Sequence, residues 1–320
     1  MKKKITVKGL WKVLKKAGKG FADDKVTKKC ASLAYYTVFS LGPLLMVIIV
    51  VASIFFGREA VEGSIYSQLE SFLGKNTALT LQEVIKNASL SGKQSFAAVV
   101  GVVTLLIGAT TVFADMQDSI NSIWGLKAKP KAGIMKLIKD RLLSFGVIGA
   151  LAFLLLVSLT VSIVVEALSK QIQTLLPDMA VVILYVINIL FTLVIISALF
   201  AIIFKILPDA KIKIKDVLPG AIATAVLFML GKLAISFYIS KSNVGSTYGA
   251  AGSIVILLLW IYYSTFILYF GAEFTKAFAM EFGHPIRPND YAVISKKKEV
   301  EMKSNSLQDA EKKAPDLKND

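Results

Sequence analysis

The stretch MAVVILYVINILFTLVIISALFAIIF, residues 179–204, holds no charged side chain. A helix rises about 1.5 Å per residue, so a helix of this length crosses the ~30 Å hydrocarbon core of a bilayer. Comparable apolar stretches lie at residues 33–56, 95–114, 142–165, 217–239 and 251–275. The sequence therefore predicts an all-α integral membrane protein, built as a bundle of six transmembrane helices.

The composition agrees with this fold class. Of the 320 residues, 55% are hydrophobic and 18% are charged, and the mean hydropathy of +0.65 is far above that of a soluble domain. The first apolar run is longer than the core of a secretory signal peptide and lacks a small-residue cleavage site, so we expect it to remain as a helix. Cys30 is the only cysteine, which excludes an internal disulfide and suits a reducing cytoplasm.

The distribution of the 37 Lys and Arg residues predicts the orientation. Most of them lie in residues 1–32, 115–141, 205–216 and after 275, whereas the other connections hold few. Because basic loops stay on the cytoplasmic side, we expect both termini to be cytoplasmic in a bacterial plasma membrane. The net charge of +15 then reports topology and an attraction to anionic headgroups, so no nucleic-acid partner is expected.

Residues 1–30 form the first predicted unit, a basic amphipathic arm. Leu10, Leu14, Ala17 and Phe21 recur at helical spacing, and lysines fill most of the remaining positions. This pattern predicts a helix that lies in the inner membrane interface. The alternative is a solvated, charged arm.

Two more units follow the arm. Residues 31–285 form the predicted six-helix domain, and residues 286–320 a polar cytoplasmic tail that we expect to be disordered, since it is rich in Lys, Glu and Asp. The connection 57–94 carries two amphipathic patterns, which predict an external helical hairpin between the first and second transmembrane helices. The pattern residues are Ile65, Leu69, Phe72 and Leu73, followed by Leu81, Val84, Ile85 and Ala88.

Polar side chains inside the predicted spans are candidates for function, because their burial in hydrocarbon costs free energy. Lys232 lies about 10 Å, and Asn188 about 14 Å, from the outer ends of their helices, with Tyr185 one turn above Asn188. We expect the three side chains to line one cavity open to the outside. The alternative for Lys232 is that its stem snorkels to the outer interface.

Other candidates lie where helices bend or touch. Pro43 removes a backbone hydrogen bond and predicts a kink or a break in the first span, where Ser40 can bond a freed carbonyl. The alternative is a packing kink that binds nothing. Gly249 and Gly252 predict either a close helix contact or a broken helix start at the sixth span.

Glu273 lies two residues from the predicted inner end of the sixth span. About 18 Å of depth separates it from Lys232, so these two side chains cannot pair. We expect Glu273 to meet Lys276, which lies one helical turn on, or a basic residue such as Arg141.

Several segments resemble a known family. They are SLAYY (32–36), SLGPL (40–44), NSIW (121–124), LPD (207–209), LPGA (218–221), YGAAGS (248–253), LWIY (259–262) and GAE (271–273). In order and spacing they resemble the BrkB/YihY family of bacterial inner-membrane proteins. The resemblance implies a six-helix plasma-membrane protein, links of some members to serum resistance and envelope lipids, and an old label as a tRNA-processing ribonuclease.

The residues do not favour a nuclease. A metal-dependent nuclease needs clustered carboxylates or histidines in contact with water. His284 is the only histidine and has no partner at ligand spacing, and a solvated helix end explains the shared face of Asp115, Asp118 and Asn121. We expect neither an enzyme nor a cofactor. No P-loop occurs in the sequence, so any transport is expected to be secondary or passive unless a partner supplies energy.

The leading hypothesis is therefore a transporter or permease-like protein for an anionic or amphiphilic envelope component. A non-transporting scaffold that organises membrane lipids is the alternative, and a ribonuclease ranks last. The expected partners are membrane lipids, through anionic headgroups at the cytoplasmic face, and a homo-oligomer stays open.

Overall fold

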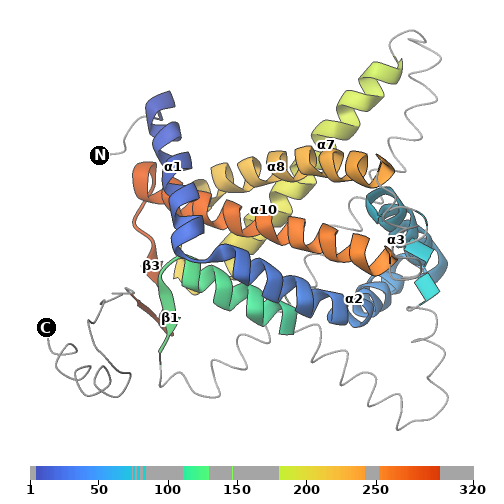
Figure 1. Cartoon of the computed structure of the whole chain (residues 1–320), viewed down its shortest axis with the longest axis horizontal. Coiled ribbons are helices and arrows are strands. Elements are labelled where there is room, and N and C mark those ends of the chain that lie inside the picture. Colours follow the sequence, from blue (N-terminus) through green and yellow to red (C-terminus); the bar gives the residue numbers. More distant parts are fainter. Residues whose placement is uncertain are drawn as a thin grey trace, which may run out of the picture.

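The computed structural model of the chain describes residues 5–73, 111–129, 180–241 and 252–295, with single positions 75, 78, 79, 82, 83 and 146. This part of the chain is mostly helical. Figure 1 shows α2 (Val26–Phe56), α8 (Ile214–Lys241) and α10 (Gly252–Phe282) packed in one layer, with α7 (Ala180–Ile206) crossing obliquely. α1 (Val7–Asp23) lies across their direction at one end.

Three helices in the described part of the chain are long and apolar enough to cross a membrane: Val182–Ile206 in α7, Ile214–Ile235 in α8 and Ile254–Phe282 in α10. They coincide with the fourth, fifth and sixth predicted spans, and α2 contains the first. The second predicted span lies outside the described residues except for its end, in helix 111–123, and the third lies outside except for residue 146. The total of six therefore stays a prediction.

The sixth predicted span ends too early. α10 continues past Thr275 as far as Phe282. Its added turns keep an apolar face, because Ala277, Phe278 and Phe282 pack against α1. Glu273 therefore lies well inside α10 and not near its end.

The predicted amphipathic arm forms a helix, but its apolar side chains divide between two environments. Val13 and Ala17 of α1 are fully buried against α10. Leu10, Trp11 and Leu14 are exposed. The predicted stripe is therefore not one membrane-facing surface, since its second half docks on the bundle.

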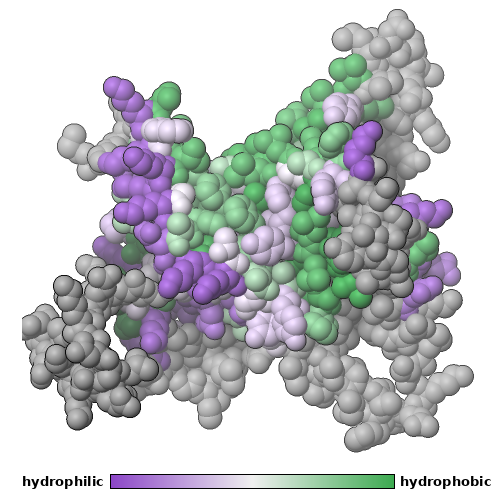
Figure 2. Space-filling model, viewed as in Figure 1, coloured by the Kyte–Doolittle hydropathy of each residue, from purple (hydrophilic) through white to green (hydrophobic). Residues whose placement is uncertain are grey.

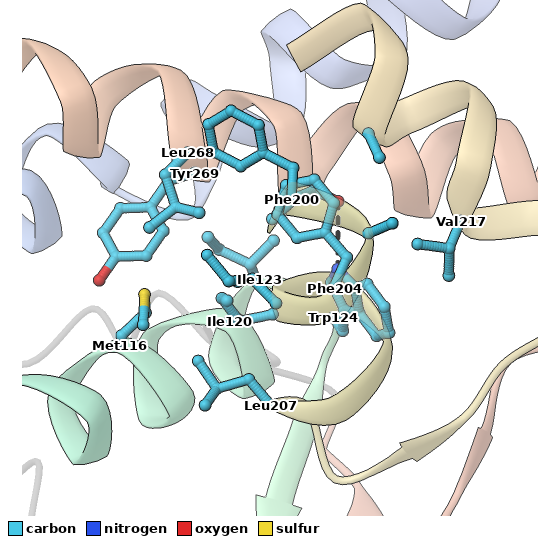
Figure 3. Close-up of a cluster of buried hydrophobic side chains, with 14 of the residues drawn as sticks. Met116, Ile120, Ile123, Trp124, Phe200, Phe204, Leu207, Val217, Leu268 and Tyr269 are labelled. Atoms are coloured by element: carbon cyan, nitrogen blue, oxygen red, sulfur yellow. Dashed lines mark hydrogen bonds between the residues drawn. The ribbon is translucent and has the colours of Figure 1, made fainter. Parts of the chain in front are cut away.

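The buried core of the described residues gathers at the end of the bundle where α1 lies. Figure 3 shows side chains of helix 111–123, α7, α8 and α10 meeting there, among them Trp124, Phe204 and Tyr269. Trp124 Nε1 donates a hydrogen bond to the main-chain oxygen of Ala272 at 3.1 Å. This bond ties the residue after helix 111–123 to the middle of α10.

α8 and α10 touch through two matched glycine–threonine pairs. A Cβ on Gly220 would lie 1.9 Å from Thr275 Oγ1, and a Cβ on Gly271 would lie 2.0 Å from Thr224 Oγ1. The Thr224 hydroxyl donates to the Gly220 carbonyl at 2.6 Å, and the Thr275 hydroxyl donates to the Gly271 carbonyl at 2.7 Å. Main chains approach this closely only because glycine has no side chain.

α3 (Arg58–Leu73) follows α2 and holds the first half of the predicted external hairpin. It lies at the opposite end of the bundle from α1 (Figure 1). Ile65 is buried, and Leu69 packs against a cluster that contains Trp260 of α10. The second half of the predicted hairpin lies almost entirely outside the described residues.

The predicted boundary between the bundle and a disordered tail at residue 285 is displaced. β3 (Arg287–Pro288) pairs with β2 (Ala210–Lys211), and β4 (Ala292–Ile294) pairs with β1 (Leu126–Ala128). Strands of two or three residues carry no periodic pattern, so the sequence could not reveal them. Residues 287–294 belong to the folded body, and residues 296–320 lie outside the described part.

These pairings bring four basic segments to one end of the molecule, which we call the basic end. It comprises α1, residues 124–129, residues 205–216 and residues 276–295. Figure 2 shows hydrophilic side chains gathered over α1 and apolar side chains over α7, α8 and α10. The polarity of the surface therefore changes at the level of α1.

Candidate functional site

α8 has a buried face and an exposed face, and Lys232 follows the buried one. Val217, Ala221 and Ala225 are fully buried at successive helical turns. Lys232 lies two turns after Ala225 on the same side and is partly buried. The exposed face consists of Ile222, Val226, Leu230, Leu233 and Phe237. Lys232 therefore lies on the side of α8 that carries the buried residues, and the choice between a cavity lysine and a snorkelling lysine stays a prediction.

Aromatic side chains pack beside this part of α8. Phe228 and Ile235, about one turn before and after Lys232, pack in one cluster with Trp260 of α10. The ring centroids of Phe228 and Trp260 lie 6.5 Å apart. The α8 segment that carries Lys232 therefore packs beside aromatic side chains of α8 and α10.

Tyr263 holds α10 close to α8 at the same level. Its hydroxyl donates to the Leu227 carbonyl at 2.9 Å. A Cβ on Gly231 would lie 1.4 Å from that hydroxyl, so Gly231 leaves the room that Tyr263 occupies. The residue before Lys232 is thus fixed by a contact between two helices.

Asn188 and Tyr185 lie in the first half of α7. Both are exposed in the described part of the chain, and Thr192 Oγ1 donates to Asn188 Oδ1 at 3.5 Å. Figure 1 shows this half of α7 extending away from the other labelled helices. A cavity that Asn188 and Tyr185 share with Lys232 stays a prediction.

The other candidates lie at two helix positions. α2 passes through Pro43 as one helix, so the predicted break does not occur there, and Ser40 is buried one turn before it. Gly252 is buried at the first residue of α10. Gly249 lies outside the described residues.

Glu273 meets Lys276, as the sequence predicts. Glu273 Oε2 and Lys276 Nζ lie 3.5 Å apart, and the Glu273 side chain is only 2% exposed. Lys276 Nζ also lies 3.6 Å from Asp24 Oδ2, between α1 and α2, and it donates to the Ile123 carbonyl. The predicted pair is therefore part of a larger group that joins three elements.

The acidic residues weighed for a nuclease have other neighbours. Ser32 Oγ donates to Asp115 Oδ1 at 3.1 Å. His284 Nδ1 lies 2.9 Å from Asp216 Oδ2, a partner that the sequence spacing did not suggest because 68 residues separate the two. No three His, Cys, Asp or Glu side chains within the described ranges lie together as a metal site would require.

Comparison with known proteins decides the family. The family described as "Virulence factor BrkB" matches residues 17–291. The chain belongs to the BrkB family. A UPF0761 membrane protein of Pseudoalteromonas translucida is 30% identical over 268 residues, which cover 81% of this chain and 83% of that protein.

Other bacterial relatives carry the same name. A UPF0761 membrane protein of Haemophilus influenzae is 27% identical over 258 residues, 80% of this chain and 90% of that protein. One from Saccharophagus degradans is 26% identical over 266 residues, 82% of this chain and 58% of that longer protein. No solved structure matches at a significant level. This BrkB-family chain is thus a membrane protein with bacterial relatives.

Two of the segments that resemble the BrkB family, NSIW (121–124) and LPD (207–209), meet at the basic end. Asn121 Nδ2 donates to Asp209 Oδ2 at 3.1 Å, and the Asp209 amide donates to Asn121 Oδ1 at 2.8 Å. Asn289 Nδ2 donates to Asp209 Oδ1 at 3.0 Å. We call these three residues the Asn–Asp clamp. It joins helix 111–123, the turn after α7 and the C-terminal strands of the BrkB-family fold.

The clamp and the role of Asn289 were missed by sequence reasoning. Asn121 and Asp209 appeared in two separate family segments, 88 residues apart, and Asn121 was otherwise placed only on a solvated helix face with Asp115 and Asp118. The only signal was that both segments contain a polar residue beside apolar ones at a predicted inner helix end. One BrkB-family sequence cannot show that these two positions touch.

Proposed function

We propose that this protein is a permease-like protein of the bacterial plasma membrane that handles an anionic or amphiphilic envelope component through a cavity open to the outer face. The observation that carries the proposal is the position of Lys232 on the buried face of α8, among aromatic side chains of α10. A lysine on the inner side of a membrane helix is suited to bind a phosphate or carboxylate headgroup. The aromatic side chains suit the apolar part of such a molecule.

The arrangement of charge supports six transmembrane helices with both termini in the cytoplasm. The four basic segments that the positive-inside rule assigns to the cytoplasm lie together at the basic end. A different orientation of any one described span would separate them. Two termini on the same side of the membrane require an even number of spans, and the sequence contains six apolar stretches of sufficient length.

Packing at the two ends supports a state that is closed on the cytoplasmic side. The largest buried cluster of the described residues, the glycine–threonine pairs and the Asn–Asp clamp all lie toward the basic end. Lys232 lies on α8 about two turns beyond Thr224, and Ile235, three residues further on, packs in one cluster with Leu69 of α3. A substrate at Lys232 would therefore come from the outer side.

Mass spectrometry of lipids retained by the purified protein tests the proposal. We expect an anionic lipid or lipid-linked molecule to co-purify with the wild type and to be lost from Lys232→Met, which keeps an apolar stem but removes the charge. Lys241→Met is the matched control, because it makes the same change at the exposed end of the same helix. Equal retention by all three proteins would count against a site at Lys232.

The second candidate is a scaffold that organises lipids at the cytoplasmic face without transport. One observation favours it: Leu10, Trp11 and Leu14 of α1 are exposed while the other side of α1 is docked on α10. An exposed apolar face beside lysines is typical of a helix that lies among anionic headgroups. In a scaffold, loss of these side chains would impair function and loss of the Lys232 charge would not.

We propose no enzymatic role. The carboxyl of Asp115 is bonded to Ser32, and Asp209 is held in the Asn–Asp clamp. Both arrangements join elements of the fold and need no metal. We expect purified protein to cleave RNA no faster than a mock preparation does.

A further inference from the structure

Glu273 is a carboxyl group buried deep in the contact between α1 and α10. Its side chain is 2% exposed, and its Oε1 atom accepts no hydrogen bond from the described part of the chain. Gly20 of α1 lies directly on it, since a Cβ there would be 2.6 Å from Glu273 Oε2. The main chain of α1 therefore covers the carboxyl and excludes water from that side.

The charges around Glu273 do not balance. Lys276 lies 3.5 Å from Glu273 and 3.6 Å from Asp24, so one ammonium group serves two carboxylates. Within the described residues, Lys276 and Asp24 are the charged groups that act on Glu273. Gly20, which lies against the carboxyl, carries no charge. With both carboxylates ionised, the group would hold one negative charge in excess at a buried place, which is unfavourable because burial removes water from the charge.

A proton is the species that fits this imbalance. One proton on Glu273 would neutralise the excess charge without added space, because a nearby negative charge favours the protonated form of a carboxyl group. Lys12 and Lys16 of α1 do not supply the missing charge, because they pair with Glu281 at 3.1 and 2.9 Å.

The group also has a route to water. Exposure of the side chains rises from 2% for Glu273 to 26% for Lys276 and 20% for Asp24. Both partners lie at the basic end, where α1 turns into α2. A proton can therefore reach Glu273 along hydrogen-bonding groups from the cytoplasmic side, although the carboxyl itself is covered.

We propose that Glu273, with Lys276 and Asp24, is a proton-exchange site that takes one proton from water at the basic end and returns it there. In the protonated state Glu273 is neutral and Lys276 pairs with Asp24. In the ionised state, the Glu273 carboxylate also pairs with Lys276. The inference stands apart from the proposed function, since the proton site exists whether or not the protein handles a lipid-like substrate.

Infrared difference spectroscopy of the protein in lipid, between about pH 5 and about pH 9, tests the proposal. We expect the C=O stretching band of a protonated carboxyl, shifted in heavy water, that is lost in Glu273→Gln. It should persist in Glu281→Gln, the matched control on the same helix and against the same α1. If the wild type and Glu273→Gln give identical difference spectra, the proposal is wrong.

A second variant tests the charge imbalance and guards against misfolding at the buried position. Asp24→Asn changes a side chain that is 20% exposed, and it leaves one carboxylate for one lysine. We expect the Glu273 band to be lost from this pH interval in Asp24→Asn while thermal unfolding stays close to that of the wild type. A band unchanged in Asp24→Asn would contradict the shared-cation account.

Discussion

Gly220 of α8 and Thr275 of α10 lie so close that a Cβ on the glycine would be 1.9 Å from the threonine Oγ1. A second contact of the same kind has the roles of the two helices exchanged, with Gly271 on α10 and Thr224 on α8. The family segments LPGA and GAE supply the two glycines, so the resemblance marks the place where these spans touch. Such close contacts stabilise the association of membrane helices, because in lipid the hydrophobic effect does not drive apolar helices together and packing must do so.

We expect Gly220→Ala to destabilise the protein by about 1–3 kcal/mol, the usual cost of overpacking. Thermal unfolding in detergent measures the change. Gly18→Ala on α1 is the control, since its Cβ would meet nothing within 4 Å, and it should be neutral or slightly stabilising. Equal stability of the two variants would show that the α8–α10 contact tolerates separation.

The Asn–Asp clamp should hold the C-terminal strands in place. Asn289→Ala removes the 3.0 Å hydrogen bond to Asp209 and leaves a buried carboxylate oxygen with one donor fewer, at a cost of about 1–3 kcal/mol. We expect faster hydrogen exchange in residues 287–294, measured by mass spectrometry, with α8 and α10 unchanged. Asp290→Asn is the control, because its ion pair with Lys211 is exposed and contributes little.

Asp115 lies one residue beyond the second predicted span. Its ionised carboxylate should lower the stability of the folded protein at neutral pH. Burial raises the pKa of the Asp115 carboxyl above its ordinary value of 3.8, so the folded protein favours the protonated form and loses stability as pH rises through that raised pKa. Asp115→Asn keeps an oxygen that can accept from Ser32 and removes the charge.

We therefore expect Asp115→Asn to raise Tm in detergent at neutral pH, with the difference from wild type shrinking as pH falls. Asp118→Asn, at an exposed position of the same helix, should change Tm little. A lower Tm for Asp115→Asn at neutral pH would show that the charge itself stabilises the fold.

Reporter fusions test the six-helix topology. Fusions within residues 205–216 and after Ser295 should report the cytoplasm, because these segments belong to the basic end. Fusions near Asn76 and Lys170 should report the outside. A periplasmic signal after Ser295 would mean that the number of spans is odd.

The sequence predicted well what depends on local composition, and poorly what depends on distant contacts. The spans in α7 and α8 and the Glu273–Lys276 pair follow from runs of apolar residues and from helical spacing. The docking of α1 on α10 does not, because Val13 and Ala17 are apolar whether they face lipid or protein.

The candidate site shows the same division. The spacing of Lys232 from Ala221 and Ala225 places the three residues on one side of α8, but only burial in the structure shows that this side is the buried one. The contact of Gly20 with Glu273 could not be predicted from the sequence, since glycine has no side chain from which a contact could be inferred. Asp24, which also pairs with Lys276, lies 249 positions before Glu273 in the sequence. No local sequence pattern could link two residues so far apart.

The most direct test of the proposed function is complementation of a deletion strain by Lys232→Met, with membrane abundance measured alongside. If Lys232 binds an anionic group inside the bundle, the variant should lose function completely at normal abundance, whereas Lys241→Met should complement. If Lys232→Met complements as well as the wild type does, the permease account is contradicted and the lipid scaffold becomes the better reading.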